Sequence, residues 1–184
     1  MGNAVDLSFL EDGSVQAAPK LIGWRLYRRE GTQLVGGVIV ETEAYNEHDA
    51  ASHSYRGQTP RTQVMFGPAG HIYVYFTYGM HHCMNIVTGL TGTGDAVLIR
   101  ALAPDEGVDI IRQRRNYQPD NKLTDGPAKI CQALLVTRRD NGKALNQGEF
   151  LLLPPVGSQP RVHATARIGI TKDTHRLWRF VIDN

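Results

Sequence analysis

An alternating aromatic stretch at residues 70–85, GHIYVYFTYGMHHCMN, constrains the fold of this chain more than any other segment. Successive side chains of an extended strand point to opposite faces, so the alternation predicts a β-strand with two different surfaces. Its polar face is predicted to carry Tyr73, Tyr75 and Thr77. Its other face is predicted to be apolar core and to carry Ile72, Val74 and Phe76. Gly79 breaks the strand, which places the ring of Tyr78 near the tip of a turn.

A second stretch, LVGGVIVETEAY at residues 34–45, has the same two-residue period. One face is predicted to carry Val38, Val40, Thr42 and Ala44. The other face is predicted to carry Ile39, Glu41, Glu43 and Tyr45. Two carboxylates and a tyrosine would therefore share one side of an otherwise apolar strand. Glutamate is mostly a surface residue, so this pattern alone is also compatible with a half-exposed strand.

The remaining hydrophobic and turn patterns predict short helices and further strands. Helices are expected at residues 13–22, 105–115 and 127–134. Further strands are expected at residues 24–29, 96–103, 149–153, 167–170 and 178–182. The connection at 46–68 exceeds the usual length of a structureless loop, so we expect it to be functional or partly helical. The pattern indicates a single α+β domain over residues 1–184, built on a curved antiparallel sheet with a protruding β-hairpin and flanked by short helices.

Composition favours a cytoplasmic protein with one hydrophobic core. The chain has 184 residues and is 41% hydrophobic, which is enough for a sizeable core. No stretch approaches the ~20 apolar residues of a membrane span, and the acidic N-terminal region does not resemble a secretory signal. Cys83 and Cys131 lie in apolar settings and are expected to remain thiols in a reducing compartment. We therefore expect no association with a membrane.

The kind of positive charge is more informative than its amount. The formal net charge is only +2, but fifteen of the twenty basic residues are arginine. The planar guanidinium matches phosphate oxygens in a bidentate way. Arg56 and Arg61, in the loop between the two key strands, are therefore candidate phosphate contacts. A second cluster, Arg112, Arg114 and Arg115, is equally well explained as a solvated helix end.

Five segments, in order along the chain, resemble the alkyladenine (3-methylpurine) DNA glycosylase family. They are ETEAY at 41–45, HSYRGQTPR at 53–61, YVYFTYGMHHCMN at 73–85, LIRALAP at 98–104 and GPAKICQAL at 126–134. The resemblance covers nearly the whole chain. It implies a monofunctional DNA glycosylase that flips alkylated or deaminated purines of the 3-methyladenine type out of duplex DNA. His81 and His82 depart from the aromatic residues that the family commonly has at these positions.

The resemblance implies that Glu43 is the catalytic carboxylate. Hydrolysis of an N-glycosidic bond passes through an oxocarbenium-like sugar, so one carboxylate can deprotonate a water and stabilise the developing charge. Arg100 lies in an apolar strand, on the side of Leu98 and Leu102, and needs a partner there. Pairing with Glu43, directly or through the water, would provide one. No lysine matches the family's site, so the implied nucleophile is water and no strand cleavage is expected.

Four further residues match the family's base pocket. Tyr45 and Tyr75 would sandwich the flipped base, and a cationic alkylated purine over such a ring gains about 0.5–2 kcal/mol. His53 would hydrogen-bond the base. Asn85 would crowd the exocyclic amino group of guanine and so exclude it. By residue type alone, each has an ordinary alternative: a core tyrosine, a surface histidine or a strand-end amide.

Tyr78 matches the family's intercalating tyrosine, and Met80 is a second DNA-contacting candidate on the same turn. A wedge of this kind fills the space that an extruded nucleotide leaves. The expected partner is therefore double-stranded DNA that contains damaged purines. We expect a monomer that needs no cofactor.

Two other classes of protein remain as alternatives. A catalytically silent nucleic-acid-binding domain would use the same tyrosines as a stacking platform, but it would have no use for Glu43 and Arg100 on apolar strands. A metalloenzyme would need a ligand set. The nearest group of ligand-type residues is His71, His81, His82 and Cys83. Its spacing contains no CxxC or HxxxH pattern, so we expect no metal.

Overall fold

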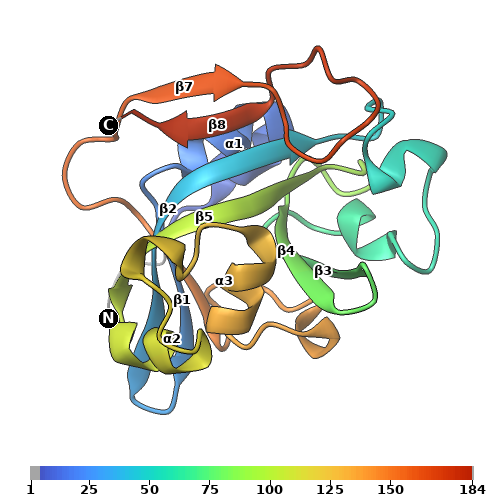
Figure 1. The fold of residues 1–184 in the computed structure, drawn as a ribbon. Coiled ribbons are helices and arrows are strands. Elements are labelled where there is room, and N and C mark those ends of the chain that lie inside the picture. Colours follow the sequence, from blue (N-terminus) through green and yellow to red (C-terminus); the bar gives the residue numbers. More distant parts are fainter. Residues whose placement is uncertain (1–4, 184) are drawn as a thin grey trace.

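A curved antiparallel sheet organises residues 5–183, the part of the chain that the computed structural model describes (Figure 1). Its strands are β1 (Arg25–Glu30), β2 (Gln33–Tyr45), β3 (Ile72–Thr77), β4 (His81–Val87), β5 (Ala96–Glu106), β6 (Phe150–Leu153), β7 (Val162–Thr165) and β8 (Arg179–Ile182). The order along the main path is β3-β4-β5-β2-β1-β6. Strand β2 is central because it pairs with β5 on one side and with both β1 and β8 on the other. The predicted α+β class with a curved antiparallel sheet is confirmed.

Short helices flank this sheet. They are α1 (Ser14–Leu21), α2 (Val108–Arg114) and α3 (Pro127–Ala133), with 3-10 turns at Ser8–Asp12, His53–Arg56, Gln63–Phe66, Asp120–Lys122 and Arg138–Asp140. Two of these turns lie in the long connection between β2 and β3, which confirms that this connection is partly helical. Strand β5 continues beyond its predicted end, so α2 begins at Val108, later than predicted, after Gly107 with φ 62°.

Helix α1 packs on the core face of β2. Its apolar side buries Ala17, Ala18 and Leu21 completely, and the Thr42 hydroxyl donates to the Ala18 carbonyl at 2.9 Å. Each large aliphatic side chain buried in this way contributes about 1.5–3 kcal/mol. The helix therefore fixes which side of β2 faces the core, and the other side is left for the site.

The predicted alternation along β2 is wrong at Ile39. This residue is fully buried in the core, on the side of Thr42 and Ala44, and does not share the face of Glu43. The cause is a pair of bulges: Ile39 opposes Leu102, Glu41 opposes Ala101 and Thr42 opposes Ile99. Val40 is therefore an extra residue in β2, and Arg100 is an extra residue in β5.

The bulge in β5 also corrects the predicted neighbours of Arg100. Leu98 and Arg100 line the same pocket, as predicted, whereas Leu102 belongs to the hydrophobic core with Ile99. The extra residue changes which side chains share a face, because faces alternate strictly only in a regular strand.

Strands β3 and β4 form a hairpin with Tyr78 and Gly79 at its tip. Their φ angles are 51° and 68°, and the Met80 amide donates to the Thr77 carbonyl at 3.3 Å. Positive φ at both central residues is the geometry of a tight hairpin turn, and Gly79 adopts it without strain. The predicted turn is confirmed.

One side chain of this hairpin differs from prediction. Ile72 and Val74 are fully buried as predicted, but Phe76 is 46% exposed because it lies where the hairpin extends beyond the core. Its ring packs against His82 at a centroid distance of 5.0 Å.

The strand predicted at residues 167–170 is wrong. The structure has no strand there, and the neighbouring strand β7 is at Val162–Thr165, paired with β8. Arg167 is turned into a buried ion pair with Asp49, and Gly169 has φ 76°, so the segment leaves the extended conformation. This irregular segment carries part of the site described below.

Both cysteines are free and buried, as expected of thiols. Within residues 5–183, no helix is long and apolar enough to cross a membrane.

Candidate active site

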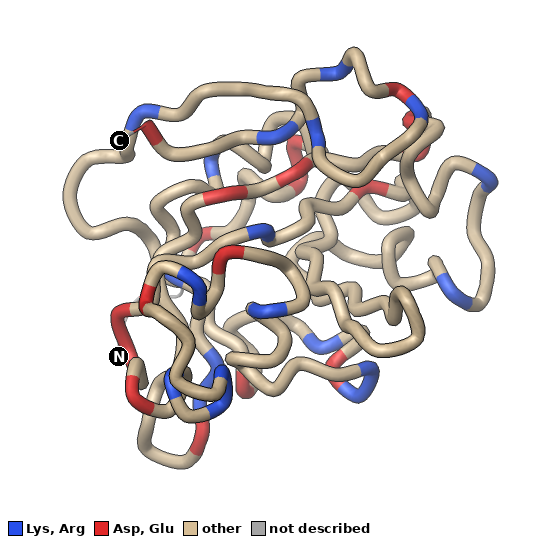
Figure 2. The backbone as a smooth tube through the Cα atoms, in the orientation of Figure 1, with Lys and Arg blue, Asp and Glu red and all other residues tan. Residues whose placement is uncertain are grey.

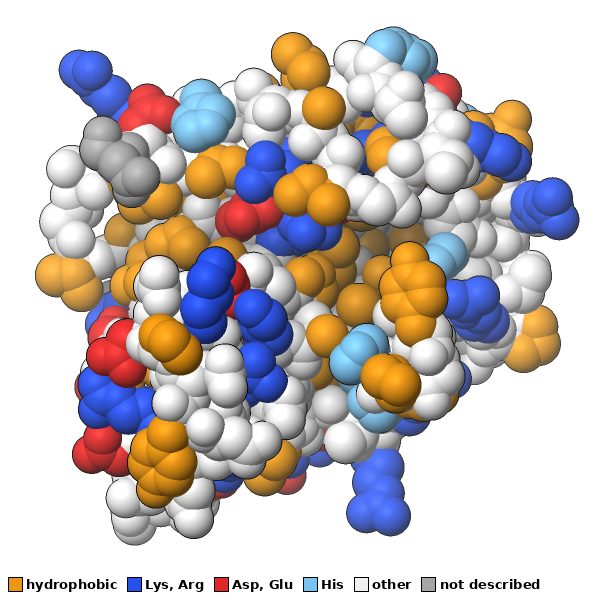
Figure 3. Space-filling model, viewed as in Figure 1, with side chains coloured by type: hydrophobic (Ala, Val, Ile, Leu, Met, Phe, Trp, Pro, Cys, Tyr) orange, Lys and Arg blue, Asp and Glu red, His pale blue; other side chains and the backbone are white. Residues whose placement is uncertain are grey.

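A pocket of about 440 Å³ opens between the β3–β4 hairpin, the connection that follows β2, the start of α3 and the segment after β7. Figure 3 shows it as a hollow near the centre of the view, floored by hydrophobic side chains. Its size lies within the range of small-molecule sites. Six of the sequence-predicted residues contribute to its wall: Tyr45, His53, Tyr75, Tyr78, Asn85 and Arg100.

Glu43 lies directly behind this wall and is fully buried. Its Oε1 accepts a hydrogen bond from the Ile168 amide at 2.7 Å, and its Oε2 accepts one from the Tyr45 hydroxyl at 2.8 Å. Arg100 Nη1 approaches Oε2 at 3.4 Å. A buried carboxylate requires such partners, and these three also fix its orientation.

Arg100 has a second and tighter carboxylate partner that the sequence reasoning missed. Its Nε donates to Glu41 Oε1 at 2.9 Å, and Arg179 Nε donates to the same oxygen at 2.6 Å. Glu41 was predicted to face the same side as Glu43, but no ion pair with Arg100 was predicted for it. The signal in the sequence was the pair of glutamates two residues apart, which places both side chains on one face.

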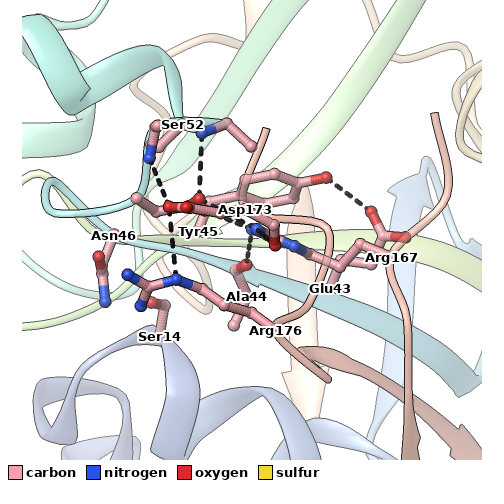
Figure 4. Close-up of polar contacts among 12 residues, drawn as sticks. Ser14, Glu43, Ala44, Tyr45, Asn46, Ser52, Arg167, Asp173 and Arg176 are labelled. Atoms are coloured by element: carbon pink, nitrogen blue, oxygen red, sulfur yellow. Dashed lines mark hydrogen bonds and ion pairs between the residues drawn. The ribbon is translucent and has the colours of Figure 1, made fainter. Parts of the chain in front are cut away.

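Arg167 is a further functional candidate that the sequence did not indicate. Its side chain is fully buried and donates to the Ala44 carbonyl at 2.9 Å (Figure 4). It also forms an ion pair with Asp49. Its guanidinium lies 4.7 Å from the ring centroid of Tyr45 and 5.3 Å from that of Trp178. One face of the Tyr45 ring is therefore covered by Arg167. Burial and the neighbouring Glu43 raise the pKa of the Tyr45 hydroxyl, so this hydroxyl remains a donor.

His53 forms the rim of the pocket with two tyrosines. Its Nδ1 lies 3.1 Å from the Tyr73 hydroxyl, and its ring meets the Tyr75 ring edge-on at 4.5 Å. Its Nε2 lies 3.5 Å from Arg61 Nη2, and because a guanidinium can only donate, Nε2 is the acceptor. Although part of the residue is exposed, burial of the ring and the charge of Arg61 lower the pKa of His53 to about 4. The histidine is therefore neutral at pH 7.

Asn85 and Cys83 complete the inner wall on β4. The Asn85 side-chain amide donates to the Tyr73 carbonyl at 3.1 Å, and the residue is buried. Cys83 faces Tyr75 across the β3–β4 pairing. Burial raises the pKa of both the Cys83 thiol and the Tyr75 hydroxyl, so both groups are neutral at pH 7.

The hairpin tip carries two large exposed side chains beside the pocket mouth. Tyr78 is 83% exposed and Met80 is 70% exposed. Of the two candidate phosphate contacts, Arg56 is exposed in the turn His53–Arg56, and Arg61 lies 6.0 Å from the Tyr75 ring centroid. Both arginines are thus near the same opening.

The other arginine cluster is occupied by internal contacts. Arg112 pairs with Asp109 and Asp120, Arg114 pairs with Glu30, and Arg115 donates to the Leu123 carbonyl. Figure 2 shows positive and negative residues side by side around α2. These contacts match the alternative of an ordinary charged helix end and do not indicate a phosphate site.

Metal-ligand side chains do not gather in the described part of the chain. Within residues 5–183, no group of three or more His, Cys, Asp or Glu side chains could hold a metal ion.

Comparison with known proteins identifies the family of this chain. The model of the methylpurine-DNA glycosylase (MPG) family matches residues 8–184. A protein of Carboxydothermus hydrogenoformans named "Putative 3-methyladenine DNA glycosylase" is 46% identical over 170 residues, which is 91% of this chain and 88% of that protein. Relatives with the same name from Methanoculleus marisnigri and Rhodopseudomonas palustris are 45% and 44% identical; the matches cover 95% and 98% of this chain, and 93% and 88% of those proteins. The chain therefore belongs to the methylpurine-DNA glycosylase family and is a DNA glycosylase, a hydrolase of N-glycosyl bonds.

Proposed function

We propose that this protein removes alkylated or deaminated purines of the 3-methyladenine type from duplex DNA by hydrolysis and that Glu43 activates the attacking water. The observation that carries the proposal is the buried Glu43 carboxylate, held by Arg100, Tyr45 and the Ile168 amide directly behind an aromatic pocket. Burying a carboxylate costs free energy of folding, so a role in catalysis explains its burial beside the pocket better than a role in stability does.

The reaction follows from this arrangement. The oxygen of a water bonds to C1′ of the sugar while the bond between C1′ and the purine nitrogen breaks, and the bonding electron pair leaves with the base. The water proton passes to the Glu43 carboxylate, and an abasic sugar and a free base result. The negative charge of Glu43 also stabilises the oxocarbenium-like sugar.

The water reaches Glu43 from the pocket side. In the structure the Tyr45 hydroxyl donates a hydrogen bond to Glu43 Oε2. Arg100 Nη1 lies 3.4 Å from the same oxygen, which is longer than a usual charge-assisted hydrogen bond. Oε2 can therefore exchange the tyrosine hydroxyl for a water when the substrate is bound. No lysine is among the residues that line this pocket, so the proposed nucleophile is water, and strand cleavage is not part of the reaction.

Base binding is assigned to the aromatic wall. Tyr75 and the free face of Tyr45 would hold the flipped base, and a cationic alkylated purine adds cation–π attraction of about 0.5–2 kcal/mol. Neutral His53 would form a hydrogen bond with the flipped base. Asn85 would exclude normal guanine, because its amide is buried and already fixed to the Tyr73 carbonyl.

DNA binding is assigned to the hairpin tip and the adjacent loop. Tyr78 would fill the space of the extruded nucleotide with Met80 beside it, and Arg56 and Arg61 would contact phosphates. The partner is double-stranded DNA with damaged purines, and the protein is proposed to act as a monomer.

The test is base release from defined duplexes. The protein is incubated in chelator with DNA that contains one 3-methyladenine or 7-methylguanine, and free base and alkali-labile abasic sites are measured. We expect stoichiometric release of both products without direct strand breaks. Binding of the damaged DNA without any release would instead support a catalytically silent binding domain.

A further inference from the structure

Four charged side chains on the pocket face of the sheet, of which Glu43 is fully buried, form a continuous row. Arg179 on β8 contacts Glu41 on β2, Glu41 contacts Arg100 in the bulge of β5, and Arg100 contacts Glu43 on β2. The exposed fractions of these side chains are 22%, 16%, 14% and 0% in that order. Figure 1 shows the three strands side by side, with β2 in the middle. We call this row the charge relay.

The distances along the relay are unequal. Glu41 Oε1 lies 2.6 Å from Arg179 Nε and 2.9 Å from Arg100 Nε, whereas Arg100 Nη1 lies 3.4 Å from Glu43 Oε2. Arg100 is thus bound to Glu41 and only approaches Glu43. A guanidinium that gave both Nε and Nη to Glu43 would make a bidentate pair and occupy the carboxylate.

We propose that Glu41 and Arg179 are positioning residues that hold Arg100 at a distance from Glu43 and thereby keep Glu43 available as a base. This inference rests on the proposed function. Neither residue touches the substrate in it, because both act through Arg100. Arg179 limits how strongly Glu41 attracts Arg100, and Glu41 limits how strongly Arg100 attracts Glu43.

Several other charged and titratable groups lie beside this row, among them the Cys83 thiol, which is close to Arg100. Glu43 faces Tyr45 and Arg100, with Arg167 beyond the Tyr45 ring, and Glu41 faces Arg100 and Arg179. His53 is a further pocket group whose pKa lies in the acid range, and it is unchanged in the variants below. Differences between the variants therefore report the relay.

The proposal predicts opposite effects of two neutral substitutions. Glu41→Gln removes a negative charge and releases Arg100 toward Glu43, so Glu43 becomes a weaker base. Arg179→Gln removes a positive charge and leaves Glu41 free to draw Arg100 away, so Glu43 becomes a stronger base. At an effective dielectric constant of about 20, a unit charge at a distance of about 10 Å changes an ionisation free energy by about 1.7 kcal/mol, which corresponds to about one pH unit.

The experiment is the pH profile of single-turnover release of 7-methylguanine from duplex DNA. This base already carries a positive charge, so it needs no acid catalyst and the acid limb reports the enzyme's base. The midpoint of that limb should move down by about one pH unit in Glu41→Gln and up by a similar amount in Arg179→Gln. Arg179→Lys keeps the charge and should return the midpoint to that of the wild type. Affinity for the lesion should stay within about twofold throughout, since neither residue contacts DNA.

The outcomes separate the two proposals. If the wild-type protein released no base, the proposed function and this inference would both fall. If the wild type is active and the two midpoints move together, or fewer than two move, only the charge relay is overturned. Thermal unfolding of each variant identifies a variant that has failed to fold, and Arg179→Lys then still tests the inference, because a displaced midpoint in this folded, charge-conserving variant contradicts it.

Discussion

At the scale of single residues, an ion pair and a backbone hydrogen bond reach Glu43 from two different parts of the chain. Arg100 approaches from β5, and the Ile168 amide approaches from the irregular segment that Arg167 anchors. The first contact joins two motifs that the sequence makes visible. The second depends on residues far apart in the chain, since Asp49 and Arg167 are separated by 118 positions.

The first prediction concerns Glu43. Glu43→Gln keeps the size of the side chain but removes its basic oxygen, so single-turnover base release should fall by about 10²- to 10⁴-fold, the usual contribution of a general base. Binding of damaged duplex DNA, measured by fluorescence anisotropy, should remain within about threefold. The matched control is Glu47→Gln, which neutralises a carboxylate that does not line the pocket and should leave release unchanged. Near-normal release by Glu43→Gln would remove this residue from the mechanism.

The second prediction separates the stability that Arg167 provides from its effect on the site. Arg167→Met leaves Asp49 as an unpaired buried carboxylate and should lower the free energy of unfolding by about 3–5 kcal/mol. Adding Asp49→Asn removes that charge and should recover most of the loss. Base release should stay low in the double variant, because the cation over Tyr45 and the anchor of the Ile168 amide are both still missing.

Urea denaturation and single-turnover kinetics measure the two quantities in the same set of variants. Recovery of release together with stability in Arg167→Met/Asp49→Asn would show that Arg167 acts only through folding.

At the scale of secondary-structure elements, the β3–β4 hairpin contributes to the site with one of its faces and with its tip. Its tyrosine face lines the pocket, and its tip projects Tyr78 and Met80 beside the pocket mouth. The positive φ angles of Tyr78 and Gly79 keep this turn tight, so Tyr78 is held at a defined distance from the pocket.

The third prediction concerns this tip. If Tyr78 replaces the extruded nucleotide in the stack, Tyr78→Ala should slow excision by about tenfold to a hundredfold on a well-paired lesion. The loss should be smaller for a mismatched or bulged lesion, because a poorly stacked base costs less to extrude. Phe76→Ala is the matched control, since Phe76 is an exposed aromatic of the same hairpin outside the pocket lining. Equal losses on paired and mismatched substrates would contradict the wedge assignment.

The elements also show what sequence reasoning can reach. The sequence predicts that Glu43 and Tyr45 share one face of their strand and that Tyr73 and Tyr75 share one face of theirs, because the residue pattern of a half-buried strand repeats every two residues. The bulges at Val40 and Arg100 were not predicted, because the two-residue pattern of each strand continues through the extra residue and does not reveal that Ile39 and Leu102 face the core. The segment at 167–170 was predicted as a strand because its apolar residues resemble one, while the partner that turns Arg167 inward lies in another part of the chain.

At the scale of the whole molecule, seven of the fifteen arginines form ion pairs among residues 5–183. Arg28, Arg112, Arg114, Arg167 and Arg179 all form ion pairs within the protein. Arg56 and Arg61 form none among residues 5–183, and both lie in the loop beside the pocket. A small net charge is therefore compatible with a localised positive surface.

The fourth prediction follows from that surface. The logarithm of DNA affinity should fall linearly with the logarithm of salt concentration, by about 0.9 for each phosphate contacted. Arg56→Ala and Arg61→Ala should each reduce this slope by about 1, while Arg112→Ala should leave it unchanged because Arg112 is held by two aspartates. Titration of a damaged duplex at several salt concentrations measures the slopes. A slope that does not respond to either loop arginine would place the phosphate contacts elsewhere.

The bulges at Val40 and Arg100 make the active site depend on the number of residues in β2 and β5 as well as on their identity. Successive side chains of a strand point to opposite faces, so either the odd-numbered or the even-numbered residues of a regular strand face the core. The extra residue at Val40 sets β2 so that Ile39 enters the core while Glu43 and Tyr45 point to the pocket. Deleting Val40 would move every side chain between the deletion and the end of β2 to the opposite face of the sheet. The Glu43 carboxylate would then lie in the core and Ala44 would line the pocket, although Glu43, Tyr45 and their neighbours would all still be present in the sequence.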